Sequence, residues 1–183
     1  MHRQWILEKI TQYQPENSAD QLQKERLTKF VQNNSDCFMR ENLAGHITGS
    51  AWIIDPDFTQ SLMTHHFKLD QWLQLGGHSD GDSNTLDVAL REVTEESGLK
   101  NIKPFHENIF DIDIHDIPAR PGTPEHLHYD VRFIIVADPN EPLIRQVEES
   151  NDLQWIPLEK VGEYNPRESI VRFVRKTQLL KNA

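Results

Sequence analysis

The sequence predicts an α+β fold, and three observations support this prediction. Before residue 45, apolar residues recur at helical spacing in two segments separated by a Pro-Glu-Asn-Ser stretch. From Gly45 onwards the pattern changes to short strand-like runs with turn residues between them. A helix with well-marked ends follows at residues 85–97, and another is predicted at residues 167–180.

Each predicted element depends on its local pattern. Two helices are expected between residues 3 and 33, and a hairpin is expected where the runs 51–54 and 61–66 flank a turn-rich Asp-Pro-Asp segment. Residues 72–75 are predicted to form a strand that leads into a turn at Gly76 and Gly77. Further strands are expected at residues 101–117, 127–137 and 153–156.

Length and composition limit the class of protein. The chain has 183 residues, which is enough for one domain with a buried core. A membrane helix needs about 18 consecutive apolar residues, and no stretch of the sequence approaches that length. The N-terminus lacks the pattern of a secretory signal, so a soluble cytoplasmic protein is expected. Cys37 is the only cysteine, so neither an internal disulfide nor a thiolate metal cluster can form. Any metal ion is therefore expected on oxygen or imidazole ligands.

The net charge indicates the kind of partner. A formal charge of −10 argues against nucleic acid and against anionic membranes, so neither is expected as a partner. An anionic small molecule remains compatible with this charge, because divalent cations can lie between protein carboxylates and a polyphosphate.

The central helix has both a buried stripe and an acidic face. Asn84 or Thr85 is expected to cap its N-terminus and Gly98 to end it. Its apolar stripe is formed by Leu86, Leu90 and Val93.

Three glutamates converge on a different face of this helix. Glu92, Glu95 and Glu96 are separated by three and four residues, which brings their side chains together. Carboxylate oxygens are the ligands that hard cations such as Mg²⁺ and Mn²⁺ prefer. A solvated acidic face is the alternative interpretation, and geometry alone does not exclude it.

The segment from Gly77 to Leu99 resembles the Nudix box of the Nudix hydrolase superfamily. Gly77, Arg91 and the later fixed positions, including Glu92, Glu95, Glu96 and Gly98, match the pattern at the correct spacing. Ser83 departs from it, because it stands where the family usually has its first glutamate. Asp80 and Asp82 are nearby carboxylates that offer a replacement, and the number of bound metal ions stays open.

The resemblance covers about residues 47–160 and implies a Nudix fold, with a mixed sheet in an α/β/α sandwich. It divides the chain into an N-terminal helical extension, residues 1–45, and a Nudix domain, residues 46–183. In similar proteins such an extension either covers the site or builds a homodimer, and the sequence leaves both open.

The resemblance also implies a metal site and a reaction. Glu92, Glu95, Glu96 and the backbone carbonyl of Gly76 would bind Mg²⁺, with Mn²⁺ as the alternative, and Arg91 would orient the carboxylates. The general base would be Glu92 or a glutamate from a loop.

Two segments outside the box add candidates. Glu149, and after it Glu148, would complete the metal site from the loop before the last strand, although a solvated acidic loop is an equal alternative. His126 and His128 would contact substrate, with Arg120 as a phosphate clamp. A structural role is the alternative for either histidine, and a dedicated zinc site is disfavoured because no thiolate supports it.

The expected function is hydrolysis of a phosphoanhydride bond in a nucleoside diphosphate derivative, such as a nucleotide sugar or ADP-ribose. A nucleoside triphosphate pyrophosphohydrolase is the nearest enzymatic alternative. A Nudix module that binds a nucleotide without turnover is the alternative from another class, and Ser83 is the feature that favours it.

Overall fold

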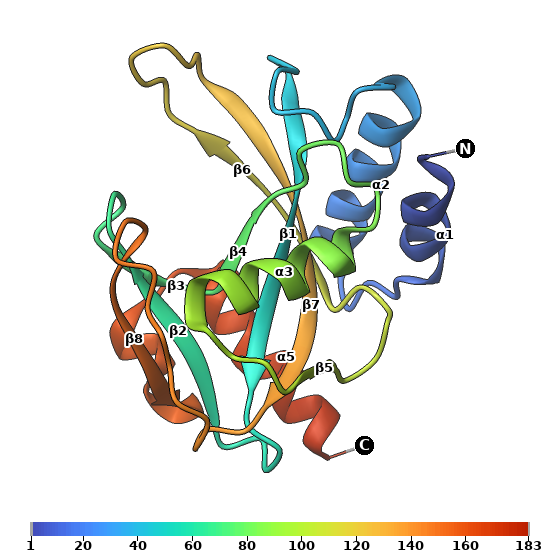
Figure 1. Cartoon of the computed structure of the whole chain (residues 1–183). Helices are drawn as coiled ribbons and strands as arrows, with labels where there is room; N and C mark the ends of the chain where they lie inside the picture. Colours follow the sequence, from blue (N-terminus) through green and yellow to red (C-terminus); the bar gives the residue numbers. More distant parts are fainter. Residues whose placement is uncertain (1, 183) are drawn as a thin grey trace. The chain divides into compact units, whose positions relative to one another are not determined.

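The computed structural model describes residues 2–182, which form an α+β fold (Figure 1). This confirms the predicted class. The described helices are α1 (Gln4–Gln12), α2 (Ser18–Asn33), α3 (Thr85–Ser97), α4 (Val161–Tyr164) and α5 (Glu168–Lys181), with a short 3₁₀ turn at Leu158–Lys160. The described strands are β1 (Gly45–Ile54), β2 (Gln60–His66), β3 (Gln71–Leu73), β4 (Leu75–His78), β5 (Ile102–Pro104), β6 (Asp111–Ile117), β7 (His126–Ala137) and β8 (Ser150–Pro157).

The hydrogen-bonded strand order is β3-β2-β1-β7-β5, with β4 beside β1, β6 beside β7 and β8 beside β2. The chain forms two compact units, and strands β1, β4 and β7 and helix α3 contribute residues to both. The first unit comprises residues 1–50, 76–89 and 107–133, and the second comprises residues 51–75, 90–106 and 134–183. Within residues 2–182, no helix is long and apolar enough to cross a membrane.

In the first unit, helix α2 packs against the β6–β7 ladder, and α1 packs against α2. Asn17 caps α2 by accepting a hydrogen bond from the backbone N–H of Asp20 at 3.0 Å. Phe30 of α2 stacks on Tyr129 of β7, with ring centroids 3.8 Å apart. The extension therefore shares its core with strands from the middle of the chain.

A buried ion network holds the β6–β7 ladder of the first unit. Arg132 pairs with Asp130 at 2.7 Å, Asp111 at 3.2 Å and Asp113 at 3.3 Å. Asp130 also accepts hydrogen bonds from the hydroxyl groups of Thr48 and Ser50. Because these charges are buried, their pairing is needed to offset the loss of water.

In the second unit, β2 is central and pairs antiparallel with the end of β1, with β3 and with β8. Trp52 packs its ring on Phe173 of α5 at 4.7 Å between centroids and donates its indole N–H to Thr177 at 3.0 Å. The predicted hairpin is confirmed, and Asp55 closes it by accepting hydrogen bonds from Thr59 and from the backbone of Gln60.

Two local predictions differ from the structure. The predicted strand at residues 101–117 is two strands. Pro104 pairs with Ile135 and Asp111 with Arg132, so the six residues 105–110 stand opposite two residues of β7 and cannot all stay in the ladder. The backbone N–H groups of Phe105 and Phe110, at the ends of this segment, still donate to the carbonyls of Ile134 and Arg132. The predicted Gly76–Gly77 turn lies instead within strand β4.

Candidate functional site

The acidic helix α3 begins and ends where its capping residues predict. Asn84 accepts hydrogen bonds from the backbone N–H groups of Leu86 and Asp87, so Asn84 rather than Thr85 is the cap. Gly98 follows the helix with φ +73°, a conformation that glycine tolerates best. A β-carbon at Gly98 would lie 2.6 Å from the β-carbon of Ile144.

The loop before β8 lies directly against the end of α3 and is held there by backbone hydrogen bonds. The backbone N–H of Ile144 donates to the carbonyl of Ser97 at 2.7 Å, and that of Gln146 donates to the carbonyl of Glu96 at 3.3 Å. The carbonyl of Glu149 accepts from the N–H of Phe67, just beyond β2. The loop is thus held at both ends.

The three glutamates of α3 differ in their access to water. Glu96 is buried, the side chain of Glu92 is 15% exposed, and that of Glu95 is 56% exposed. Arg91 donates to Glu92 at 3.2 Å and lies 4.0 Å from Glu95. Glu92 and Glu95, which differ in exposure, therefore share the guanidinium of Arg91.

Burial raises the pKa of Glu92 above its ordinary value, although Arg91 opposes this shift by its hydrogen bond and charge. The negative charges of Glu95 and Glu149 raise the pKa of Glu92 further. The charge of Glu149 therefore acts on Glu92, and both Glu148 and Glu149 are exposed in this loop.

The remaining box residues belong to the first unit. Gly76 has φ +152°, and a β-carbon there would lie 2.4 Å from the Ser50 hydroxyl, so β4 approaches β1 too closely for any side chain. Asp80 is bound by Arg40, and Asp82 accepts from the backbone N–H of Asn84. Both offered replacements for the missing glutamate at Ser83 thus have partners, Asp80 one in the segment before β1 and Asp82 one at the start of α3.

Arg120 and the two predicted histidines also lie in the first unit. Arg120 is exposed in the β6–β7 loop, where its backbone bridges to Thr123. His126 and His128 alternate along β7 and so share a face. The Nδ1 atom of His126 lies 2.8 Å from the carbonyl oxygen of Pro124.

Two further histidines join this pair, and sequence reasoning missed both. His46 opens β1 with its ring 4.7 Å from that of His128, and His78 ends β4 with its ring 5.0 Å from that of His46. Burial lowers the pKa of His46 to about 4, with further lowering by His78, His126 and Arg40. Burial and the neighbouring imidazoles also place the pKa of His128 far below its ordinary value. His78 directly follows Gly76 and Gly77, and this position could have marked it as a candidate site residue in the sequence.

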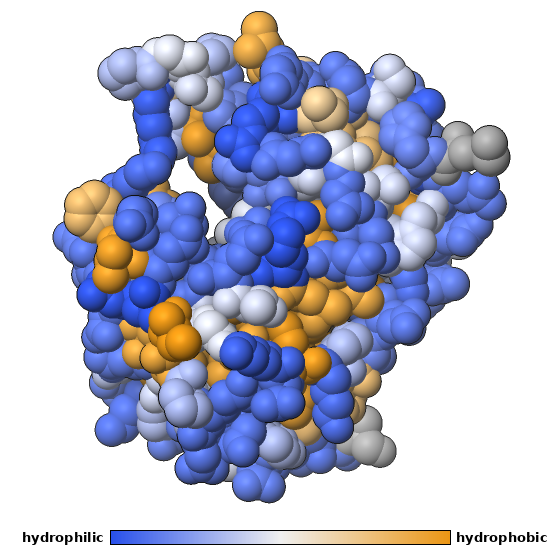
Figure 2. Space-filling model, viewed as in Figure 1, coloured by the Kyte–Doolittle hydropathy of each residue, from blue (hydrophilic) through white to orange (hydrophobic). Residues whose placement is uncertain are grey.

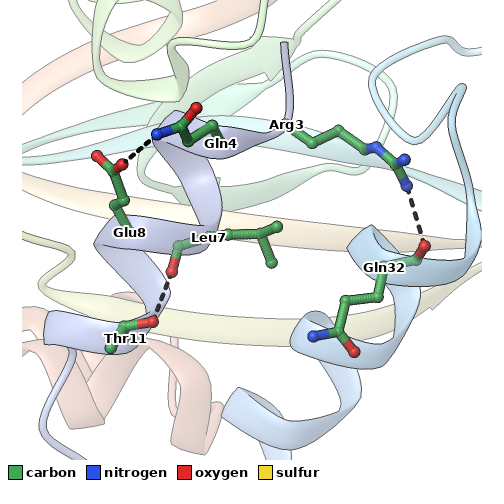
Figure 3. Close-up of a pocket in the computed structure, with 6 residues that line it drawn as sticks. All are labelled: Arg3, Gln4, Leu7, Glu8, Thr11 and Gln32. Atoms are coloured by element: carbon green, nitrogen blue, oxygen red, sulfur yellow. Dashed lines mark hydrogen bonds between the residues drawn. The ribbon is translucent and has the colours of Figure 1, made fainter. Parts of the chain in front are cut away.

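A separate hollow of about 530 Å³ lies along α1 (Figure 3). Its polar groups bond to one another or to backbone: Gln4 donates to Glu8 at 2.9 Å, and Arg3 donates to the carbonyl of Gln32 at 3.0 Å. The surface drawn in Figure 2 is mainly hydrophilic, with scattered apolar patches. The lining residues of the hollow are Arg3, Gln4, Leu7, Glu8, Thr11 and Gln32, with a single carboxylate among them. We assign no chemistry to this hollow.

The chain is similar to known proteins in sequence and in fold. Residues 46–176 match the model of the family described as NUDIX domain. A NUDIX-family hydrolase from Clostridium perfringens shares 24% identity over 74% of this chain and 97% of its own, with a TM-score of 0.56. The C. elegans Ap4A hydrolase shares 14% identity over 73% and 96%, with a TM-score of 0.59.

The E. coli dihydroneopterin triphosphate pyrophosphohydrolase shares 16% identity over 75% of this chain and 96% of its own, with a TM-score of 0.55. At these identities the solved structures establish a shared fold. No curated protein matches the chain.

Proposed function

The chain belongs to the NUDIX domain family and is a pyrophosphohydrolase, and from this premise we propose that it cleaves a nucleoside diphosphate derivative with the help of a divalent metal ion. A nucleotide sugar or ADP-ribose is the proposed substrate type. The observation that carries the proposal is the pair of carboxylates Glu92 and Glu95 at the guanidinium of Arg91, with buried Glu96 on the same helix and the charge of Glu149 acting on Glu92.

This carboxylate group fits a hard divalent cation. Glu96 is buried and Glu92 nearly so, and burial, together with the charges of Glu95 and Glu149, raises the pKa of Glu92. A bound cation would compensate these charges, and oxygen ligands of this kind suit Mg²⁺ or Mn²⁺. We propose Glu92, Glu95 and Glu96 as ligands, with Glu149 as a further ligand.

Residues of the chain would supply the other roles in the proposed reaction. When bound, the ion would polarise phosphate oxygens and lower the pKa of a water molecule. Arg91 holds Glu92 in place by a charge-assisted hydrogen bond, and burial raises the pKa of Glu92, which makes its carboxylate a stronger proton acceptor than that of an exposed glutamate. We further propose that Arg120 and His126 contact the phosphates or the base of the substrate.

A substrate panel tests the proposal. The full chain is incubated with Mg²⁺ or Mn²⁺ and with ADP-ribose, nucleotide sugars, nucleoside triphosphates or dinucleoside polyphosphates, and the products are separated by chromatography. Release of a nucleoside monophosphate together with a phosphosugar is expected. Turnover confined to triphosphates would assign the alternative substrate class, and nucleotide binding without any turnover would refute the enzymatic proposal.

A matched pair of variants tests the ligand assignment. Glu96→Gln keeps the size of the side chain but removes its charge, so turnover is expected to fall well over tenfold, which is about 1.4 kcal/mol or more. Glu163→Gln, exposed in α4, is the control and should keep the wild-type rate. Equal rates for both variants at saturating metal would refute Glu96 as a ligand.

A further inference from the structure

We propose that His46, His78 and His128 form a second metal site, which takes a borderline transition-metal ion such as Zn²⁺ rather than Mg²⁺. One ring nitrogen from each of the three histidines lies within 4.8 Å of the other two. All three residues belong to the first unit. The carboxylate group and its hydrolytic reaction do not enter this proposal.

The first argument is geometric. An ion equidistant from three nitrogens 4.8 Å apart would lie about 2.8 Å from each, whereas Zn–N bonds are about 2.0–2.1 Å. Each nitrogen therefore has to move by less than about 1 Å, which small side-chain rotations provide. Three imidazoles also leave a fourth tetrahedral position open to a water molecule.

The second argument is the state of the buried nitrogens. His46 is only 2% exposed, and both of its ring nitrogens lack a hydrogen-bond partner among residues 2–182. The Nε2 atom of His128 is likewise buried without a hydrogen bond among these residues. Buried polar atoms are normally satisfied, and an ion bound by these nitrogens would satisfy them.

The third argument is that the backbone holds the three rings together from separate strands. His46 lies on β1, His78 on β4 and His128 on β7, while β4 pairs with β1. Gly45 has φ +135°, and a β-carbon there would lie 2.4 Å from the carbonyl oxygen of Leu127. This contact brings the start of β1 directly against β7, between His126 and His128.

The chemistry of the ligands selects the metal. Neutral imidazole suits Zn²⁺, Cu²⁺ and Ni²⁺, whereas Mg²⁺ requires oxygen ligands. Arg40 is a nearby positive charge that opposes a cation, but it is paired with Asp80, whose negative charge acts on His46 in the opposite direction. The assignment of His128 to this site replaces its predicted contact with substrate.

Zinc titration of the metal-free full chain tests the proposal. With Mg²⁺ in excess to fill oxygen sites, one equivalent of Zn²⁺ should bind and raise the midpoint of thermal unfolding. His46→Gln and His78→Gln should each weaken Zn²⁺ binding at least about tenfold, because each removes one of three ligands. The matched control His106→Gln, in the second unit, and the triple variant Glu92→Gln, Glu95→Gln, Glu96→Gln should bind Zn²⁺ as wild type does.

Nitrogen NMR of the imidazoles gives a direct readout. Zinc should shift the ring nitrogens of His46, His78 and His128 but not those of His65 or His106. Because His46 is buried, the fold of each variant is checked by circular dichroism, and half-buried His78 supplies the decisive variant if His46→Gln fails to fold. Zinc binding retained by a folded His78→Gln, or lost in the triple glutamate variant alone, would overturn the proposal.

Discussion

Replacement of Glu92 by glutamine is expected to separate stability from turnover. The like-charge pair of Glu92 with Glu95 disfavours the folded state by about 0.2–0.5 kcal/mol, and the charge of Glu149 acts in the same direction. Against this, the ion pair with half-exposed Arg91 contributes about 0.2–1 kcal/mol. These two contributions to the free energy of unfolding nearly cancel. What remains is the cost of burying a charged carboxylate, which glutamine avoids because it is neutral.

The pKa of Glu92 sets how this effect depends on pH. Because the folded-state pKa lies above the ordinary value of 4.5, the folded chain binds more protons than the unfolded chain between these two pH values. The stability of the wild type therefore falls as pH rises through that window. Glu92→Gln lacks this titration, so its stability relative to wild type should be greatest above the folded-state pKa and should decline as pH falls.

Urea unfolding of the metal-free proteins at pH 5 and pH 8 measures this effect. At pH 8, Glu92→Gln should be within about 0.5 kcal/mol of wild type or more stable. With metal and substrate present, its turnover should fall at least tenfold, about 1.4 kcal/mol in activation free energy. Glu163→Gln should change neither quantity. A loss of more than about 1 kcal/mol at pH 8 would show that the Glu92 carboxylate stabilises the fold, and would refute the reasoning.

Three further substitutions test other parts of the structure by urea unfolding. Arg132→Met leaves three buried carboxylates without their partner and should reduce the free energy of unfolding by about 3–5 kcal/mol; a loss below 1 kcal/mol would contradict the network. Asp55→Ala removes a hydrogen-bonded carboxylate whose pKa is held below 3.8. Above pH 3.8 the variant should lose about 2 kcal/mol of the free energy of unfolding, and this loss should shrink as the pH falls through the folded-state pKa of Asp55. Gly98→Ala should lose about 2 kcal/mol or more through its positive φ and its contact with Ile144, whereas Gly162→Ala, with 4.0 Å to its nearest neighbour, should not.

The acidic helix was predictable because its determinants are local. Its cap, its terminal glycine and the spacing of Glu92, Glu95 and Glu96 all lie within one segment of the chain, where helical periodicity translates directly into position. The role expected for Arg91 came from the family resemblance rather than from this spacing. Resemblance to the family pattern was still needed to favour a metal site over a solvated face.

The histidine cluster was not predictable, because it depends on strand register. His46, His78 and His128 are far apart in the sequence and meet only through the pairing of β4 with β1 and the close approach of Gly45 to Leu127. A shift of one residue in any of these strands would turn its histidine to the other face. The absence of cysteine also argued against zinc, although imidazoles alone can bind this metal.

The two proposed sites differ in the hardness of their ligands, and this difference makes them separable within one chain. Carboxylate oxygens favour Mg²⁺ and Mn²⁺, but affinity for N and O ligands generally rises from Mn²⁺ towards Cu²⁺, so Zn²⁺ also competes for the carboxylates of α3. Mg²⁺ does not compete in return for the imidazoles of His46, His78 and His128. Excess Mg²⁺ should therefore restore turnover lost to added Zn²⁺ without releasing the ion held by the histidines.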